Sequence, residues 1–315
     1  LMTAGLTEVV RPTLPTNPDL ARMRRDRMQK VRDLMRAQGL DAMVLLGNSN
    51  VAYVTGLGWP LSDSGRATFE RPVAVVTVDD AVPHLFTPMR ADDRLAAALP
   101  ADHLHQGTYL DFDEGVESFV KSLAGLVPVG AKVALDEWTH AMARERSLLF
   151  AADPTDAGRV IGSAKLLKTP DEIACMREGL RISEVAVAEV QKMVAPGVRQ
   201  SDLTATFLRT IFEAGVDANV MDPVWQVMAP RIADGPWTTT GEVACPLLTT
   251  ERVLEKGDVI WNDVSTTFGG MHTDFGRTWV VGREPNARER ELFDKWKNVV
   301  GAVLAVTRAG ARASD

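Results

Sequence analysis

Two aspartates in the C-terminal half of the sequence have the side chains and the spacing that a metal site needs. Asp263 lies near the end of one β-prone run and Asp274 near the start of another, and a loop with Gly269 and Gly270 separates the runs. This pattern predicts a β-hairpin. If the turn is centred between Phe268 and Gly269, the two aspartates are direct cross-strand neighbours, with Cβ atoms roughly 4.5–5.5 Å apart.

Carboxylates held this close repel each other, and something must compensate for the repulsion. Either one carboxyl group is protonated or a cation lies between the two. Divalent ions accept carboxylate oxygens, and two-metal hydrolase sites hold their ions roughly 3.5–4 Å apart. We therefore expect Asp263 and Asp274 to be metal ligands. The alternative is structural: Asp263 caps a turn and Asp274 pairs with Arg277.

The first half of the sequence alternates between strand and helix patterns. Apolar runs predict the strands, and amphipathic stretches predict the helices. The strands are expected at 42–46, 73–78 and 131–136, and the helices at 18–39, 91–99, 114–127 and 138–150. This alternation is typical of an α/β domain with a largely parallel sheet.

A change of pattern near residues 152–168 indicates a domain boundary. Residues 160–167 are expected to form a short connecting strand. A long helix then begins after Thr169, because Thr169 and Glu172 have the spacing of a capping box. Another helix is expected at 202–214, and strand and loop patterns follow it.

Motifs in both halves of the chain resemble one enzyme family. Asp274 opens the sequence Asp-Phe-Gly-Arg-Thr, eleven residues after Asp263, and Lys-Thr-Pro-Asp-Glu-Ile occupies residues 168–173. Asn-Ser-Asn-Val-Ala-Tyr-Val-Thr-Gly occupies residues 48–56. The aspartate interval, the Asp-x-x-Arg-Thr signature and the two upstream stretches resemble the family of Xaa-Pro aminopeptidases, prolidases and creatinases. The resemblance spans nearly the whole chain.

The resemblance implies a fold of two domains and a dinuclear metal site. Residues 1–160 are expected to form an α/β creatinase-type N-terminal domain. Residues 161–315 are expected to form the first part of an α+β catalytic domain with the pita-bread fold. In this family two Asp, one His and two Glu bind two divalent ions, Mn²⁺, Zn²⁺ or Co²⁺. By resemblance, Asp263 binds the first ion and Asp274 bridges both.

The resemblance also implies that three ligands follow later in the chain. The family's His and its two Glu lie in segments beyond the next helix, and this sequence ends at Asp315. The chain is therefore expected to be truncated at its C-terminus and to be inactive alone, with an apolar sheet face left uncovered. Two carboxylates without the other ligands are expected to bind a divalent ion weakly.

Five further residues are candidates for the same site. His272 is two residues before the second aspartate, so on a strand it shares that aspartate's face and acts as a catalytic proton shuttle or substrate contact. A solvated hairpin histidine is the alternative. Arg277, with Thr278 beside it, is expected to shape the site by holding a carboxylate. Trp225 and Trp237 are expected to line a substrate pocket, with core packing as the alternative.

The remaining histidines lie in the N-terminal half. His103 and His105 have a spacing that metal ligands can have, whereas nothing close in the sequence completes a site. Surface positions are therefore expected for both.

The composition disfavours several classes of function. The sequence has 35 Lys and Arg against 42 Asp and Glu, and its net charge of −7 disfavours nucleic-acid binding. No apolar run reaches the ~18 residues of a membrane span, and no secretory signal opens the chain. Cys175 and Cys245 are expected to be buried free thiols in a reducing compartment, which indicates the cytoplasm.

These patterns predict a metal-dependent hydrolase, an Xaa-Pro aminopeptidase or dipeptidase that cleaves the amide bond next to proline in a small peptide. Family peptidases carry a substrate-contacting His upstream of the first Asp, and residues 238–246 contain none. One alternative is therefore a creatinase-like hydrolase or lyase of a small non-peptide molecule. Another is a non-catalytic binding module on the same fold. A homodimer is expected, because in this family the N-terminal domain of one subunit often approaches its partner's active site.

Overall fold

The computed structural model describes residues 17–56, 71–88, 98–227 and 251–314, and the chain forms two compact units. The first unit comprises Leu1–Ile182, Phe212–Val220 and Ser265–Thr273, and the second comprises Ser183–Ile211, Met221–Val264 and Asp274–Asp315. Because these segments interleave along the chain, the simple division into residues 1–160 and 161–315 stays a prediction.

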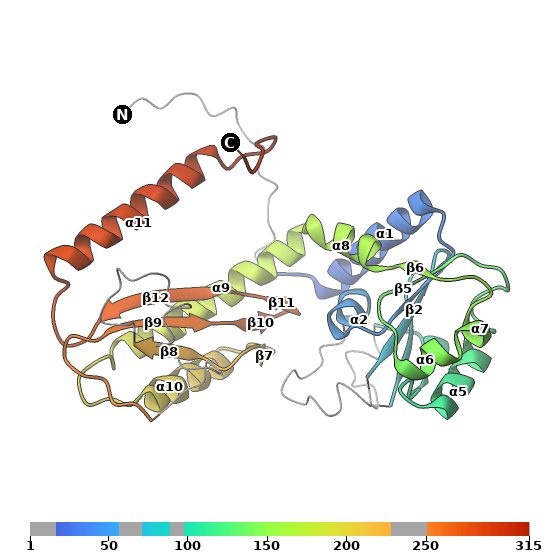
Figure 1. Cartoon of the computed structure of the whole chain (residues 1–315), viewed down its shortest axis with the longest axis horizontal. Helices are drawn as coiled ribbons and strands as arrows, with labels where there is room; N and C mark the ends of the chain where they lie inside the picture. Colours follow the sequence, from blue (N-terminus) through green and yellow to red (C-terminus); the bar gives the residue numbers. More distant parts are fainter. Residues whose placement is uncertain (1–16, 57–70, 89–97, 228–250, 315) are drawn as a thin grey trace. The chain divides into compact units, whose positions relative to one another are not determined.

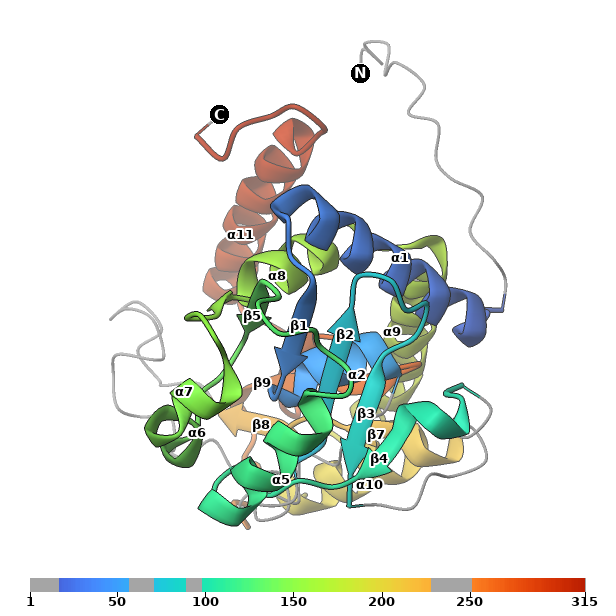
Figure 2. The ribbon, with the colours of Figure 1, turned by 90° about the vertical axis from the view of Figure 1, so that its right-hand side faces the viewer.

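A six-stranded sheet forms the centre of the first unit. Its strands are β1 (Ala42–Leu45), β2 (Val73–Thr77), β3 (His84–Thr87), β4 (Leu104–Gln106), β5 (Val133–Leu135) and β6 (Thr155–Asp156). Their order across the sheet is β4-β3-β2-β1-β5-β6, and Figure 2 shows β5, β1, β2 and β3 side by side.

The sheet is mixed, which corrects the expectation of a largely parallel one. Strand β2 is antiparallel to both β1 and β3, whereas the other three pairings are parallel. Residues 78–83 are the whole connection between β2 and β3. A connection this short permits a hairpin, because a parallel crossover needs a dozen residues or more.

Helices cover both faces of this sheet. One core joins its strands to α1 (Leu20–Gln38), α2 (Asn48–Thr55) and α8 (Gly158–Leu166). The other core joins them to α5 (Asp113–Leu123), α6 (His140–Arg144) and α7 (Arg146–Leu149). The expected α/β layer domain is thereby confirmed. The helix expected at 91–99 lies almost entirely outside the described residues.

Residues 160–167 were expected as a strand, and residues 160–166 instead belong to α8, with Leu167 just after its end. Val160, Ile161 and Ala164 are buried together in the first core, and their spacing places them on one face of a helix. Asp156 assists the start of α8, because its carboxylate accepts a hydrogen bond from the backbone N–H of Gly158 at 2.7 Å. Val160 and Ala164 are four residues apart and both face this core, which a helix allows because residues i and i+4 lie on the same helix face.

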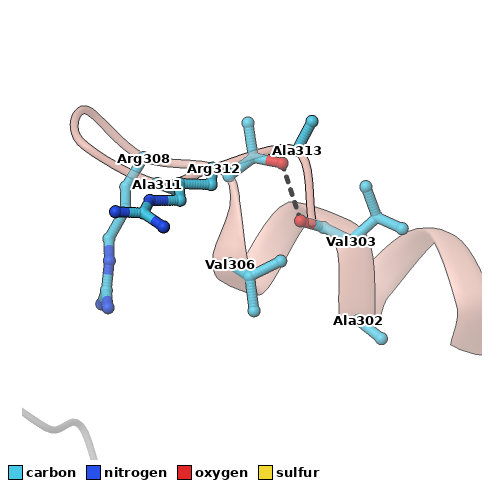
Figure 3. Close-up of a pocket in the computed structure, with 8 residues that line it drawn as sticks. Ala302, Val303, Val306, Arg308, Ala311, Arg312 and Ala313 are labelled. Carbon is cyan, nitrogen blue, oxygen red and sulfur yellow. Dashed lines mark hydrogen bonds between the residues drawn. The ribbon is translucent and has the colours of Figure 1, made fainter. Parts of the chain in front are cut away.

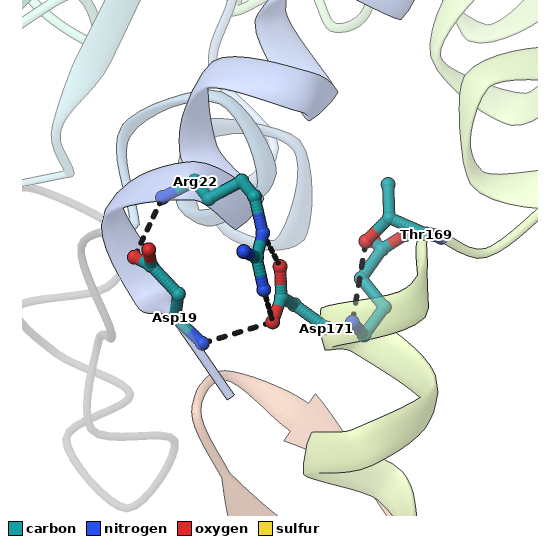
Figure 4. Close-up of polar contacts among 5 residues, drawn as sticks. Asp19, Arg22, Thr169 and Asp171 are labelled. Atoms are coloured by element: carbon teal, nitrogen blue, oxygen red, sulfur yellow. Dashed lines mark hydrogen bonds and ion pairs between the residues drawn. The ribbon is translucent and has the colours of Figure 1, made fainter. Parts of the chain in front are cut away.

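The long helix α9 (Pro170–Gln191) begins with the predicted capping box. Glu172 accepts from the backbone N–H of Thr169 at 2.6 Å, and the Thr169 hydroxyl accepts from the N–H of Glu172 at 3.2 Å. The same turn binds α1. Asp171 accepts two hydrogen bonds from the Arg22 guanidinium, at 2.7 and 2.8 Å (Figure 4). Arg27 donates to Glu172 at 2.8 Å, and both side chains are buried.

A small sheet of the first unit surrounds the hairpin turn. It contains β7 (Ala218–Asn219), β10 (Thr266–Phe268) and β11 (Met271–His272), in the order β11-β10-β7. Cys175 is buried, and burial raises the pKa of its thiol to about 11. The expectation of a buried free thiol is confirmed for Cys175, whereas Cys245 lies outside the described residues.

The second unit contains most of α10 (Gln200–Glu213), a three-stranded antiparallel sheet and α11 (Ala287–Val306) (Figure 1). The strands are β8 (Val224–Val227), β9 (Val259–Val264) and β12 (Phe275–Val280), and β9 is central. Helix α11 starts at a capping box of Asn286 and Glu289 and has no buried residue. None of the described helices is both long and apolar enough to cross a membrane.

Removal of the Glu172 carboxylate is expected to destabilise the first unit strongly. Glu172→Ala leaves the Arg27 charge buried without its partner, which costs about 3–5 kcal/mol. Urea unfolding followed by circular dichroism measures this loss. The control is Glu189→Ala in the same helix, where an exposed pair with Lys192 is worth at most about 1 kcal/mol. Equal losses in the two variants would contradict the buried pair's role.

Candidate metal site

The hairpin turn is centred one residue later than the sequence suggested. Strand β10 pairs with β11 through Thr267 opposite His272, which leaves Gly269 and Gly270 as the two central turn residues. Their φ angles are 58° and 71°. Two-residue hairpin turns of type I′ require positive φ at both central positions, and glycine adopts it without strain. Gly269 and Gly270 therefore suit the two central positions of this turn.

This register corrects the predicted pairing of the two aspartates. Asp263 faces Gly276 on β12 and Val224 on β8, so Asp274 is not its direct cross-strand neighbour. Asp274 lies just before β12 begins and is exposed. The two carboxyl groups nevertheless interact. The pKa of Asp263 is raised, first by burial and then by the negative charge of Asp274.

On the side of β12, the residues that share the face of Asp263 are small or exposed. Gly276 presents no side chain there, and a Cβ atom at this position would lie 2.9 Å from the carbonyl oxygen of Asn262. Thr278 is two residues further along β12, so it shares this face, and it is exposed. The sequence reasoning did not select Gly276. The signal available in the sequence was a glycine inside a β-prone run, because such a glycine often marks a place where a ligand or another backbone comes close to the strand.

Trp225 lies on the opposite face of the same sheet. It pairs with Asn262, the neighbour of Asp263, and strand residues alternate between faces. Its ring is 1% exposed and packs between Phe207 and Trp279, at centroid distances of 6.2 and 6.3 Å. This placement favours core packing, the alternative to a substrate wall. Trp237 lies outside the described residues.

Arg277 is anchored to its own strand. Its guanidinium lies over the Phe275 ring, 4.0 Å from the centroid, and donates to the Gly276 carbonyl at 2.8 Å. Its backbone N–H donates to the side-chain oxygen of Asn262 at 2.7 Å. In the described part of the chain Arg277 and Asp274 form no ion pair, so the structural alternative for Asp274 is not supported. That Arg277 and Thr278 shape the site stays a prediction.

His272 lies in β11 of the first unit, whereas both aspartates lie in the second. Much of its side chain is exposed. Desolvation by nearby atoms lowers the pKa of its imidazole, and the positive charge of Lys165 lowers it further. The ring is therefore neutral near pH 7 and can accept a proton. Its catalytic role stays a prediction.

The donor set of Asp263 and Asp274 fits a divalent cation. A cation bound by both carboxylates removes their mutual repulsion, which after burial is the second cause of the raised pKa of Asp263. Carboxylate oxygens are ligands for Mn²⁺ and also for Zn²⁺. A separate hollow beside the end of α11 contains neither aspartate; alanine and valine side chains line it together with Thr307, Arg308 and Arg312 (Figure 3).

The chain matches two known domain families along most of its length. Residues 27–163 match the creatinase/prolidase N-terminal domain, and residues 174–315 match metallopeptidase family M24. These matches agree with the predicted creatinase-type and pita-bread domains.

Individual relatives are distant. The Xaa-Pro dipeptidase of Pyrococcus horikoshii is 20% identical over 272 residues, which is 85% of this chain and 68% of that protein. Methionine aminopeptidase 1A of Arabidopsis thaliana is 27% identical over 147 residues, 46% of this chain. The chain spans 35% of that aminopeptidase's length.

Solved structures of similar fold include the Pyrococcus horikoshii prolidase, with a TM-score of 0.61 and 18% identity over 85% of this chain and 68% of that one. Proline aminopeptidase P II from Yersinia pestis has a TM-score of 0.64 and 17% identity, over 91% of this chain and 69% of that one. At these identities the likeness shows the fold, and it confirms the fold class expected from the sequence.

Metal-free protein is expected to become more stable at neutral pH when Asp263 is replaced by Asn. A raised carboxyl pKa means that the folded state binds a proton more readily than the unfolded state, so stability falls as pH rises through that range. Asp263→Asn removes this penalty. Its stabilising effect is expected at pH 7.5 and is expected to vanish near pH 3, below the ordinary carboxyl pKa of about 3.9.

Urea midpoints measured in the presence of a chelator test this expectation. Asp222→Asn is the control, because Asp222 is an exposed carboxylate of the same unit. If the gain in stability persists at pH 3, or if the control gains equally, the raised pKa of Asp263 is not its source.

Proposed function

Because the chain joins a creatinase/prolidase N-terminal domain to a domain of metallopeptidase family M24, we propose that the protein is an Xaa-Pro dipeptidase or aminopeptidase. Its substrates are small peptides, and the bond cleaved is the amide next to proline. The extent of similarity supports this choice. Relatives named Xaa-Pro dipeptidase or probable dipeptidase PepE match 85% and 88% of the chain, including its N-terminal half.

Asp263 and Asp274 are proposed as ligands of two divalent ions, Mn²⁺, Zn²⁺ or Co²⁺. When bound, such ions lower the pKa of a water molecule and polarise the scissile carbonyl group. The repulsion between the aspartates supports the assignment, because in the metal-free state it already favours a positive charge at Asp263. Gly276, the residue opposite Asp263, adds no side chain beside the carboxyl group, and a Cβ atom there would lie only 2.9 Å from the carbonyl oxygen of Asn262.

His272 is proposed as the group that moves a proton during the reaction. Its lowered pKa leaves the imidazole neutral near pH 7, so it can accept a proton and return it to the leaving amine. Arg277 and Thr278 are proposed to shape the site from β12. Arg277 does so by stiffening the strand through its contacts with Phe275 and Gly276.

Methionine aminopeptidase activity is a second candidate. Two methionine aminopeptidases match the chain at 26% and 27% identity, somewhat above the dipeptidases. Their matches cover 46% and 47% of the chain, however, and leave the other half without a counterpart. A substrate panel separates the two activities, since one requires proline after the scissile bond and the other requires an N-terminal methionine.

A small non-peptide substrate is the third candidate. Residues 238–246 contain no histidine where family peptidases carry one, which favours this alternative. This segment lies outside the described residues. Small amidino compounds and betaines belong in the same panel.

We further propose that the protein is a cytoplasmic homodimer. Light scattering during size-exclusion chromatography can test the oligomeric state.

Replacement of Asp274 by Asn is expected to abolish metal-dependent hydrolysis of Xaa-Pro dipeptides. The protein is expressed from its complete reading frame and assayed with added Mn²⁺, Co²⁺ or Zn²⁺. Loss of a ligand is expected to reduce kcat/KM by more than about 100-fold, since groups that only support a ligand are worth 10–100-fold. Bound metal is measured in parallel by elemental analysis.

Asp222→Asn serves as the matched control, because it removes an exposed carboxylate of the same unit and is expected to keep full activity. Unchanged turnover by Asp274→Asn would exclude the proposed site. Turnover of N-terminal methionine peptides, or of the non-peptide compounds alone, would keep the site and replace the substrate assignment.

A further inference from the structure

A group of three histidines and one aspartate lies at one edge of the six-stranded sheet in the first unit. Asp80 lies in the connection between β2 and β3, and His84 is the first residue of β3. His103 ends the short 3₁₀-helix η1 (Ala101–His103), and His105 lies in β4. We call these four residues the histidine cluster. Surface positions were expected for His103 and His105, because nothing close in the sequence completes a site. In the fold, both lie against His84.

The side chains of the cluster are in direct contact. His84 Nε2 lies 3.3 Å from Asp80 Oδ2, and His84 Nδ1 lies 3.0 Å from His105 Nε2. The rings of His84 and His103 stack with centroids 3.9 Å apart and planes 5° from parallel. Ligand atoms of Asp80, His84 and His103 all lie within 4.8 Å of one another, which no other group of three such residues achieves in the described part of the chain.

Surrounding groups orient the potential ligands. His103 Nδ1 lies 3.3 Å from the carbonyl oxygen of Pro83. Because a carbonyl only accepts, this contact assigns the proton to Nδ1 and leaves the lone pair on Nε2. The Thr77 hydroxyl donates to Asp80 Oδ2. Metal-binding histidines and carboxylates typically have supporting partners of this kind.

The central position of His84 is suited to exchange of a proton for a metal ion. If Nδ1 donates to His105, the Nε2 lone pair points at the Asp80 carboxylate, and two acceptors then lie 3.3 Å apart. In the other tautomer Nε2–H donates to Asp80, and a metal ion bound between the two atoms takes the place of that proton. Burial lowers the pKa of His84 and of His105, and neighbouring histidines lower both further. Neutral rings expose the lone pairs that bind metal.

We propose that Asp80, His84 and His103 form a metal site separate from the aspartate pair, with His105 as a positioning residue for His84. Two imidazole nitrogens and one carboxylate favour Zn²⁺, with Co²⁺ as a spectroscopic substitute, over ions that prefer oxygen ligands alone. Asp80 and His103 are partly exposed, so water can supply a fourth ligand. The bound ion connects the β2–β3 turn to η1 and stabilises this edge of the sheet.

Metal binding requires the stacked rings to tilt. A metal ion lies near the plane of each imidazole that binds it, and the planes of His84 and His103 are almost parallel. Rotation of the partly exposed His103 side chain can bring the two lone pairs to a common point. The expected consequence is loss of the ring stack on metal binding, which imidazole NMR shifts report.

The test uses the full chain with Asp263→Asn and Asp274→Asn, so that the aspartate pair does not contribute. After chelator treatment, Co²⁺ is titrated while visible absorption is recorded, and Zn²⁺ is titrated by calorimetry. One equivalent is expected to bind and to raise the melting temperature. His103→Gln is expected to weaken binding more than about 100-fold, and His105→Gln about 10–100-fold, as for a supporting partner.

His140→Gln is the matched control, because His140 is an exposed histidine of the same unit and is expected to leave binding unchanged. His103 is partly exposed, so its replacement is expected to preserve the fold, and Asp80→Asn gives a second ligand variant that keeps side-chain size. No binding up to about 1 mM Zn²⁺, or equal affinity in His103→Gln and His140→Gln, would overturn the proposal.

Discussion

The conformation of two adjacent glycines determines the register on which the candidate metal site depends. Gly269 and Gly270 both adopt positive φ, so the turn contains these two residues and no others. Strands β9 and β12 pair in the same register as β10 and β11. Because side chains alternate along a strand, a shift of one residue would move Asp263 to the opposite face. The turn therefore sets the face of the sheet on which the Asp263 carboxylate lies.

The register also decides what surrounds Asp263. Gly276 lies opposite, and the bulky Trp225 lies on the other face with Phe207 and Trp279. Aromatic side chains therefore pack one face of this sheet, whereas Gly276 and Thr278 on the face that carries Asp263 are exposed. Burial of the carboxyl group and, after it, repulsion from Asp274 raise the pKa of Asp263. A cation between the two carboxyl groups would offset both effects.

Local signals in the sequence predicted local structure well. Thr169 and Glu172 form their capping box because both partners lie within one helical turn. The same holds for the strands at 42–46 and 73–78, whose apolar runs are buried on both faces. The error at residues 160–167 has the same origin. A short apolar run fits either a strand or a buried helix, and only packing against α1 and α2 decides between them.

Features that need distant parts of the chain were not predictable in this way. The partner of Arg27 is 145 residues away, and no spacing rule links the two. His84 and His103 stack because β3 and β4 are parallel neighbours at the sheet edge, which follows from strand order. Trp225 could be assigned to either face of its strand until its pairing with Asn262 was known. The aspartate pair was found because its two members flank one turn.

The two groups of potential ligands differ in chemistry and therefore in the ions they favour. Asp263 and Asp274 offer only oxygen atoms, and they carry a negative charge that attracts any divalent ion. The histidine cluster offers neutral nitrogen lone pairs beside one carboxylate, Asp80, whose pKa is lowered chiefly by its hydrogen bond from Thr77. Nitrogen donors discriminate against Mn²⁺ in favour of Zn²⁺, as the order of stabilities for first-row ions requires. The histidine cluster therefore selects among divalent ions more strongly than the aspartate pair does.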